Sequence, residues 1–195
     1  MEHVGRRAIE IYQQVMTPQQ VEFTNDWWGS LVKDEGRLVA WVQKLYNSEV
    51  HGYEEYLGFT TRYKLDTETR AALRSMAMDE CRHAGFLDSW LAYRGLATNT
   101  SLKPSQYWTE MQRHVTDFQS ACAIKYYGER LAAERFVLLR DHPDTPDDLF
   151  HPFRWIAPDE ARHCDLMFAF AGDEAIVAME EHHKNAVANL VKKKS

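Results

Sequence analysis

Apolar side chains recur at steps of three and four along most of this chain, which is the spacing of one face of an α-helix. The pattern predicts long helices over about residues 37–60, 66–94 and 104–140, and a fourth between a turn at 141–147 and Gly172. Shorter helices are expected at about 5–16, from Pro18 onward, and at about 174–191. The fold class is therefore all-α, a four-helix bundle with additional N- and C-terminal helices.

Helix start and stop signals separate these segments. Thr17-Pro18-Gln19-Gln20 has the form of a capping box with proline at the first helical position. Asp34-Glu35-Gly36 predicts a break, Asp66 or Thr67 an N-cap, and Gly95 a stop. Pro152 and Pro158 fall in or before the fourth helix, so we expect it to start late or to kink just before residue 160.

Composition narrows the class of protein. With 195 residues and 45% hydrophobic composition, we expect one domain over 1–195 with its core bundle at about 37–172. A net charge of −6 gives no electrostatic case for nucleic acid. No apolar run approaches the roughly 20 residues that span a bilayer, and no signal-peptide pattern opens the chain, so we expect a cytoplasmic protein without a membrane partner. Cys81, Cys122 and Cys164 form an odd set that fits a reducing compartment.

Polar residues interrupt the apolar stripes at corresponding places in the two halves. Asp79-Glu80-Cys81-Arg82-His83 returns 80 residues later as Asp159-Glu160-Ala161-Arg162-His163. The same offset carries Glu49 onto Glu129 and Glu54 onto Glu134. We interpret the halves as a duplicated pair of helices.

The repeated motif has the geometry of a metal site. A Glu and a His at i and i+3 share one helix face and can bind the same ion. Two such helices, with one Glu from each of two others, supply the ligands of a dimetal carboxylate centre in a four-helix bundle. Four carboxylates would not tolerate a bundle interior without neutralisation, whereas two divalent cations cancel their charge.

One Glu must be chosen in each half. Glu49 and Glu54 lie about 140° apart around a helix, so both cannot face one centre. Glu49 is about as far from its interhelical turn as Glu80, and Glu129 matches Glu160 in the same way. We therefore predict Glu49 and Glu129 as ligands, with Glu54 and Glu134 outside the ligand set; whether either replaces a ligand stays open.

The repeated Asp-Glu-x-Arg-His, each copy preceded by a lone Glu one helix earlier, resembles the ferritin-like di-iron carboxylate superfamily, most closely its oxygen-activating branch. The resemblance covers about residues 37–172 and implies a ferritin-like bundle. It implies that Glu49, Glu80 and His83 bind one iron and that Glu129, Glu160 and His163 bind the other, with Glu80 and Glu160 bridging.

The same resemblance assigns roles around the ligands. It pairs Asp79 with His163 and Asp159 with His83, and it lets Arg82 and Arg162 brace the aspartates; ordinary surface ion pairs are the alternative. Tyr53 and Tyr126 are candidate redox-active or hydrogen-bonding residues, and core packing is the alternative for both. Small residues near the ligands allow either a substrate pocket or close helix packing.

The sequence also departs from some relatives. Rubrerythrins carry an extra Glu where this chain has Ala132, and they have a cysteine-rich domain whose paired spacing is absent here. This disfavours a rubrerythrin-type peroxidase. Storage ferritins use a less symmetric ligand set, which makes iron storage a weaker expectation than oxygen chemistry.

The function expected from the resemblance is a non-haem di-iron oxidase or oxygenase that uses O2 to oxidise a small organic substrate. Electrons would come from an external donor or from the substrate. The alternatives are an iron-handling ferroxidase and a non-catalytic bundle stabilised by metal. The oxygen and nitrogen donors also accept manganese or other divalent metals, and the sequence leaves the substrate, the redox partner and the oligomeric state, a homodimer included, undecided.

Overall fold

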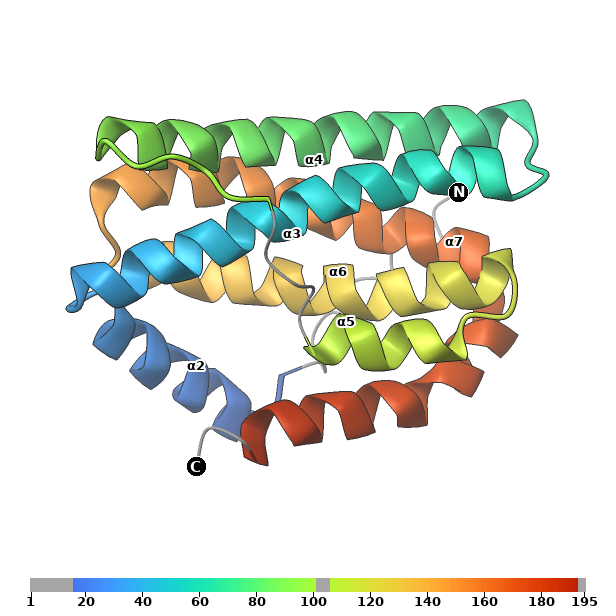
Figure 1. Cartoon of the computed structure of the whole chain (residues 1–195). Coiled ribbons are helices and arrows are strands. Elements are labelled where there is room, and N and C mark those ends of the chain that lie inside the picture. Colours follow the sequence, from blue (N-terminus) through green and yellow to red (C-terminus); the bar gives the residue numbers. More distant parts are fainter. Residues whose placement is uncertain (1–15, 101–105, 193–195) are drawn as a thin grey trace.

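The computed structural model describes residues 16–100 and 106–192, and every regular element in that part of the chain is helical (Figure 1). The elements are α2 (Pro18–Leu31), α3 (Glu35–Arg62), α4 (Thr67–Tyr93), α5 (Gln106–Met111), the 3₁₀ turn η1 (Gln112–His114), α6 (Phe118–Asp141) and α7 (Asp147–Lys192). The helix predicted over about 5–16 lies almost wholly outside the described residues.

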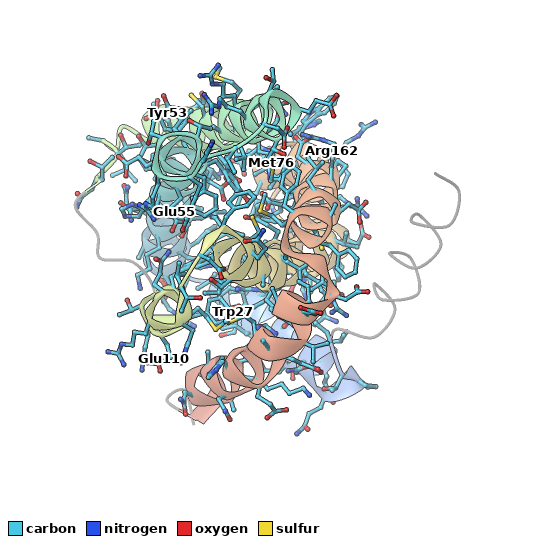
Figure 2. All side chains as sticks on the ribbon, turned by 90° about the vertical axis from the view of Figure 1, so that its right-hand side faces the viewer. Trp27, Tyr53, Glu55, Met76, Glu110 and Arg162 are labelled. Carbon is cyan, nitrogen blue, oxygen red and sulfur yellow. The ribbon has the colours of Figure 1, made fainter. Side chains whose placement is uncertain are left out.

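Two helical hairpins form the bundle. The long helices α3 and α4 pack side by side, α6 packs against the first part of α7, and α4 contacts α7 across the two hairpins (Figure 1). Figure 2 looks along the bundle and shows Met76 pointing into the interior, whereas Arg162 lies on the outside. The predicted all-α four-helix bundle is confirmed, with α2 and the end of α7 as additional helices.

Most helix boundaries follow from capping side chains. Thr17 and Gln20 form the predicted capping box, Asp34 caps α3, and Asp66 rather than Thr67 caps α4. After α4, Gly95 has a φ of 71°, and the N–H of Leu96 donates to the carbonyl of Leu91 at 3.1 Å. This closure is the left-handed glycine stop that the sequence predicts.

The prediction of one helix over 104–140 is wrong. The chain is helical in α5 and η1, becomes extended at Val115, and starts α6 anew after Asp117. The Asp117 carboxylate accepts from the N–H of Ser120 at 2.8 Å, and the Ser120 hydroxyl accepts from the N–H of Asp117 at 2.9 Å. This capping box satisfies donors that a continuous helix would have bonded internally, and so begins a new helix.

The fourth bundle helix starts at Asp147 and contains both Pro152 and Pro158 with helical dihedrals, so the expected late start is wrong, whereas the kink expected just before residue 160 stays a prediction. Each proline leaves one carbonyl without its N–H partner. Those carbonyls belong to Asp148 and Arg154, which are exposed residues where water can supply the bond. The predicted end at Gly172 is confirmed as a sharp bend, with φ 74° and ψ 161°.

The core consists of two apolar clusters, one toward each end of the bundle. The first contains Tyr56, Phe59 and Met76, and the second contains Leu38, Val42, Leu87 and Phe136. Glu49 lies between them on α3 and Glu80 between them on α4. The clusters therefore leave a middle layer for polar residues.

None of the described helices is both long enough and apolar enough to cross a membrane.

Candidate metal centre

Six buried glutamate and histidine side chains lie in the middle layer of the bundle, and they come from all four bundle helices. Each takes a place in an inner stripe that otherwise carries apolar residues, so the helical period directs it inward. The six are Glu49 on α3, Glu80 and His83 on α4, Glu129 on α6, and Glu160 and His163 on α7. These are the residues that the sequence predicts as metal ligands, and the structure brings all of them together.

The six side chains form two overlapping groups. Glu49, Glu80, His83 and Glu160 each offer one donor atom, and these atoms lie within 4.8 Å of one another. The same holds for Glu80, Glu129, Glu160 and His163. Glu80 and Glu160 belong to both groups, which is the position of two carboxylates that bridge neighbouring cations.

Both imidazole rings turn Nδ1 toward the carboxylates. His83 Nδ1 lies 3.3 Å from Glu49 Oε2 and 3.3 Å from Glu160 Oε1. His163 Nδ1 lies 3.3 Å from Glu80 Oε1, yet it is buried and has no partner in hydrogen-bond geometry. A buried ring nitrogen without such a partner, aimed at carboxylate oxygens, fits a metal ligand.

The other ring nitrogen of each histidine contacts the aspartate of the opposite motif. His83 Nε2 lies 3.1 Å from Asp159 Oδ2, and His163 Nε2 lies 3.4 Å from Asp79 Oδ2. When Nε2–H donates to the aspartate, the lone pair of Nδ1 points inward, which is the tautomer that a metal needs. The crossed pairing matches the one that the resemblance implies.

Two arginines close this arrangement on the outside of the bundle. Arg82 lies 2.7 Å from both Asp79 and Asp159, and Arg162 contacts the same two carboxylates. These contacts, with the histidine hydrogen bonds, hold the pKa of Asp79 well below its usual range and that of Asp159 at about 2 despite partial burial. Both aspartates therefore stay charged and fix the orientation of the histidines.

The pKa values of three inner carboxylates are shifted strongly from their usual range. Burial, reinforced by the charge of Glu49, raises the pKa of Glu80 to about 8. Burial and the neighbouring carboxylates also raise the pKa of Glu160. Burial alone would raise the pKa of Glu129 as well, but a hydrogen bond with Glu160 and the charge of Lys125 lower it to about 2. Such a group of carboxylates needs positive charge, and two divalent cations would provide it.

Known proteins resemble the part of the chain that builds this centre. The sequence model of the Rubrerythrin family matches residues 42–171. The chain belongs to the rubrerythrin family. It is also 29% identical over 127 residues to the aerobic magnesium-protoporphyrin IX monomethyl ester [oxidative] cyclase of Rubrivivax gelatinosus. That match covers 64% of this chain and 33% of the relative, so the chain spans about a third of the length of the curated relative. No solved structure matches.

Membership of the rubrerythrin family confirms the ferritin-like bundle and the resemblance to di-iron carboxylate proteins. The sequence analysis disfavoured a rubrerythrin-type peroxidase because Ala132 stands where rubrerythrins carry an extra Glu. The family match leaves that difference in place. Ala132 packs against the second apolar cluster.

Two further side chains contact the centre and were missed as functional residues from the sequence. The buried Tyr56 hydroxyl donates to Glu129 Oε1, and Nζ of the buried Lys125 lies 3.6 Å from the same oxygen. Lys125 precedes Glu129 by one helical turn, and this spacing in the sequence could have indicated that it lies beside the ligand. Tyr56 follows Glu49 by seven residues, about two helical turns, which places it on the same face of α3 and was the corresponding signal in the sequence.

In the part of the chain that the structure describes, none of the remaining candidates forms a hydrogen bond or ion pair with the six-residue group. Tyr53 is half-buried against the first apolar cluster, and the Tyr126 hydroxyl accepts from Arg130 at 3.2 Å. Glu54 is exposed and lies 3.4 Å from His51. Glu134 is half-buried, and burial raises the pKa of its carboxyl to about 7. Neither acid belongs to either group of candidate ligands.

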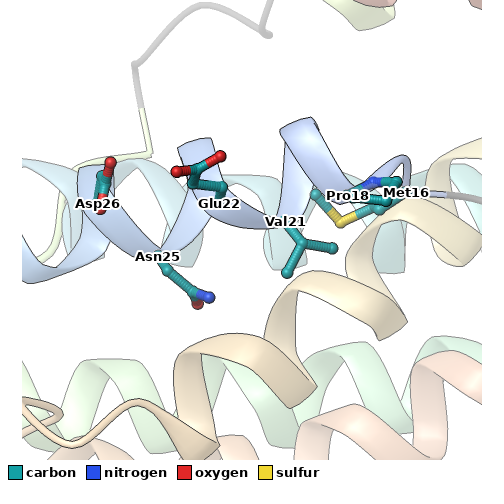
Figure 3. Close-up of a pocket in the computed structure, with 6 residues that line it drawn as sticks. All are labelled: Met16, Pro18, Val21, Glu22, Asn25 and Asp26. Carbon is teal, nitrogen blue, oxygen red and sulfur yellow. The ribbon is translucent and has the colours of Figure 1, made fainter.

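Neither of two hollows in the described part of the chain is lined by the six residues. A surface hollow of about 510 Å³ lies beside α2, lined by Met16, Pro18, Val21, Glu22, Asn25 and Asp26 (Figure 3). A crevice of about 10 Å³, the size of one water molecule, lies between α3, η1 and α6, with Glu55, Trp108 and Lys125 among its lining residues. The second hollow reaches the Lys125 side of the centre.

Proposed function

We propose that this chain is a non-haem di-iron oxidase or oxygenase, in which O2 oxidises a small organic substrate. The observation that carries the proposal is the pair of buried Glu/His groups that share Glu80 and Glu160. The rubrerythrin-family match and the oxidative reaction in the name of the Rubrivivax relative support it.

Each half of the centre would hold one iron. Glu49 and His83 would bind the first ion, Glu129 and His163 the second, and the shared Glu80 and Glu160 would bridge both. Bound ferrous iron supplies the electrons and the open coordination positions that O2 reduction requires. The donor set fits, because hard carboxylate oxygens and imidazole nitrogens suit iron and manganese.

The protein's own residues would orient the metal ligands, neutralise charge around them and shield the centre from water. Asp79 and Asp159 hold a proton on Nε2 of the facing histidine, which keeps Nδ1 free for the metal. Tyr56 donates to Glu129 and so fixes one oxygen of that carboxylate. The two apolar clusters on either side of the polar layer exclude bulk water, which strengthens electrostatic interactions inside it. A further electron donor, or the substrate itself, would restore the reduced state.

The test is anaerobic loading of metal-free protein with ferrous iron, followed by O2. We expect two irons per chain, O2 consumption, and a change in the visible absorption spectrum that requires both ions. Glu80→Ala should abolish the spectral change. Uptake well beyond two irons per chain would instead support an iron-storing ferroxidase. Metal binding that only raises the melting temperature, without O2 consumption, would support a non-catalytic bundle.

A further inference from the structure

The two halves of the centre repeat their ligands but not the residues around them. The offset of 80 residues that carries Glu49 onto Glu129 also carries Tyr56 onto Phe136, and Leu45 onto Lys125. One half therefore has a hydroxyl and an ammonium group where the other half has two hydrocarbon side chains. This difference concerns Glu49 and Glu129, the two carboxylates that each belong to only one of the two ligand groups.

On the α6 side, both polar groups converge on one oxygen. Tyr56 is fully buried and donates to Glu129 Oε1, and Lys125 Nζ lies 3.6 Å from the same atom. The ammonium group also lies 3.0 Å from Glu55 Oε2 and 4.6 Å from the centre of the Tyr56 ring. Lys125 is only 4% exposed, so water screens its charge weakly.

On the α3 side, the residues at the corresponding places are apolar. Phe136 belongs to the second apolar cluster and the partly buried Leu45 packs against it, and the Phe136 ring lies 5.4 Å from that of Phe153. Glu49 Oε2 instead lies 3.3 Å from His83 Nδ1. In the described part of the chain, the corresponding pair of Glu129 and His163 makes no ion pair within 4.0 Å. Glu129 is thus held toward Tyr56 and Lys125, whereas Glu49 is held toward its histidine.

These contacts act differently on a cation in each half. An oxygen that already accepts a hydrogen bond and lies beside an ammonium group is a weaker metal ligand, and a buried positive charge repels a nearby cation. Glu55 offsets part of this repulsion. Among the described residues, no ammonium or hydroxyl group forms an ion pair or hydrogen bond with Glu49, whose partner is His83.

We propose that the two metal positions are unequal: a divalent cation binds first and tightly at Glu49, Glu80, His83 and Glu160, and a second binds more weakly at Glu80, Glu129, Glu160 and His163, with Tyr56 and Lys125 setting the difference. The inference rests on the proposed dimetal centre. Lys125 and Tyr56 are positioning residues, because they act through Glu129.

The first experiment uses the unaltered protein and Mn²⁺ as the probe. Metal-free protein is titrated with Mn²⁺ by calorimetry and by electron paramagnetic resonance, and a crystal with one equivalent is examined by anomalous scattering. We expect two resolved binding steps and an anomalous peak beside His83 and Glu49. Equal peaks, or a peak first beside His163, would overturn the inference while leaving the dimetal centre intact. Absence of bound Mn²⁺ would overturn the dimetal centre itself.

The second experiment exchanges the surroundings of the two halves. Tyr56→Phe and Lys125→Leu give the Glu129 half the residues found beside Glu49, and should each tighten the second step by about tenfold, the order expected for one lost charge-assisted contact. Lys125→Leu combined with Glu55→Gln controls for the unpaired Glu55. The converse variant Phe136→Tyr should weaken the first step. Two steps that stay unchanged in folded variants, as judged by circular dichroism, would contradict the roles of Tyr56 and Lys125.

Discussion

The backbone of Gly52 lies directly against the carboxylate of Glu80. A Cβ atom at position 52 would come within 2.9 Å of Cδ and Oε2 of Glu80, closer than carbon and oxygen atoms pack. Helix α3 therefore approaches α4 at the level of the candidate metal centre as closely as a glycine permits. This supports the close-packing interpretation of this small residue near the ligands.

Gly52→Ala should disturb the metal centre more than the fold. The new methyl group must displace the Glu80 side chain, while alanine favours the helix by about 1 kcal/mol, so the free energy of unfolding of the metal-free protein should change little. We expect the affinity for Mn²⁺ to fall about tenfold, at the lower end of the roughly 10–100-fold range for changes in residues that orient metal ligands. Calorimetric titration measures it.

Gly58→Ala is the matched control on the same helix. A Cβ at position 58 meets only the end of the Arg62 side chain, at 3.9 Å. This variant should raise the free energy of unfolding by up to about 1 kcal/mol without altering metal affinity. Equal metal affinities for both alanine variants would argue against the close contact at Gly52.

Removing a shared carboxylate should abolish paired metal binding. Glu80→Ala and Glu160→Ala each take one ligand from both groups, so we expect fewer than two metal ions per chain by elemental analysis. Glu54→Ala and Glu134→Ala remove acids that lie outside the groups, and the stoichiometry of two should persist. Loss of an ion in either of these variants would overturn the choice of Glu49 and Glu129.

Asp159→Asn should weaken metal binding without removing a ligand. The amide no longer accepts as strongly from His83 Nε2, and Arg82 loses one of its charged partners. Partners of this kind change metal affinity by about 10–100-fold. We expect that loss in a Mn²⁺ titration, with little change in the helical circular dichroism signal. An unchanged affinity would show that the aspartates only form surface ion pairs and do not support the metal ligands.

His183 should make the stability of the fold depend on pH. Its Nδ1 atom lies 2.9 Å from the Tyr107 hydroxyl, its ring stacks on Tyr127, and burial together with the charge of Arg130 lowers its pKa from 6.5 to about 4. The unfolded chain therefore binds more protons between pH 6.5 and pH 4. Stability from this residue is complete above pH 6.5 and falls as the pH drops through that window, by up to about 3 kcal/mol.

Urea unfolding at pH 7 and pH 4.5 measures this effect when the native chain is compared with His183→Gln. Other groups that titrate in the window contribute to both proteins and cancel in the difference. The native chain should lose more stability between the two pH values than the variant. Equal losses would show that His183 does not carry the effect.

Much of the fold was predictable, because caps and helical periodicity act over a few residues. The starts after Thr17, Asp34 and Asp66 and the bends at Gly95 and Gly172 depend on side chains and dihedrals within one turn of the boundary. The break at residues 115–117 was missed although its capping box is local, because the apolar stripe continues through it. Pro152 and Pro158 misled only about where the fourth helix starts, because the carbonyls that they leave unpaired belong to exposed residues, where water can supply the lost bonds.

The sequence by itself determined the helical class, the repeated motif and the inward direction of six polar side chains, because each follows from the 3.6-residue period of a helix. Only the tertiary structure decided which groups meet across the helices. The contact of Tyr56 with Glu129 joins residues 73 positions apart, and that of His83 with Asp159 joins residues 76 apart. Such pairs depend on how the two hairpins dock, and the packing of two apolar clusters sets that docking rather than any local pattern.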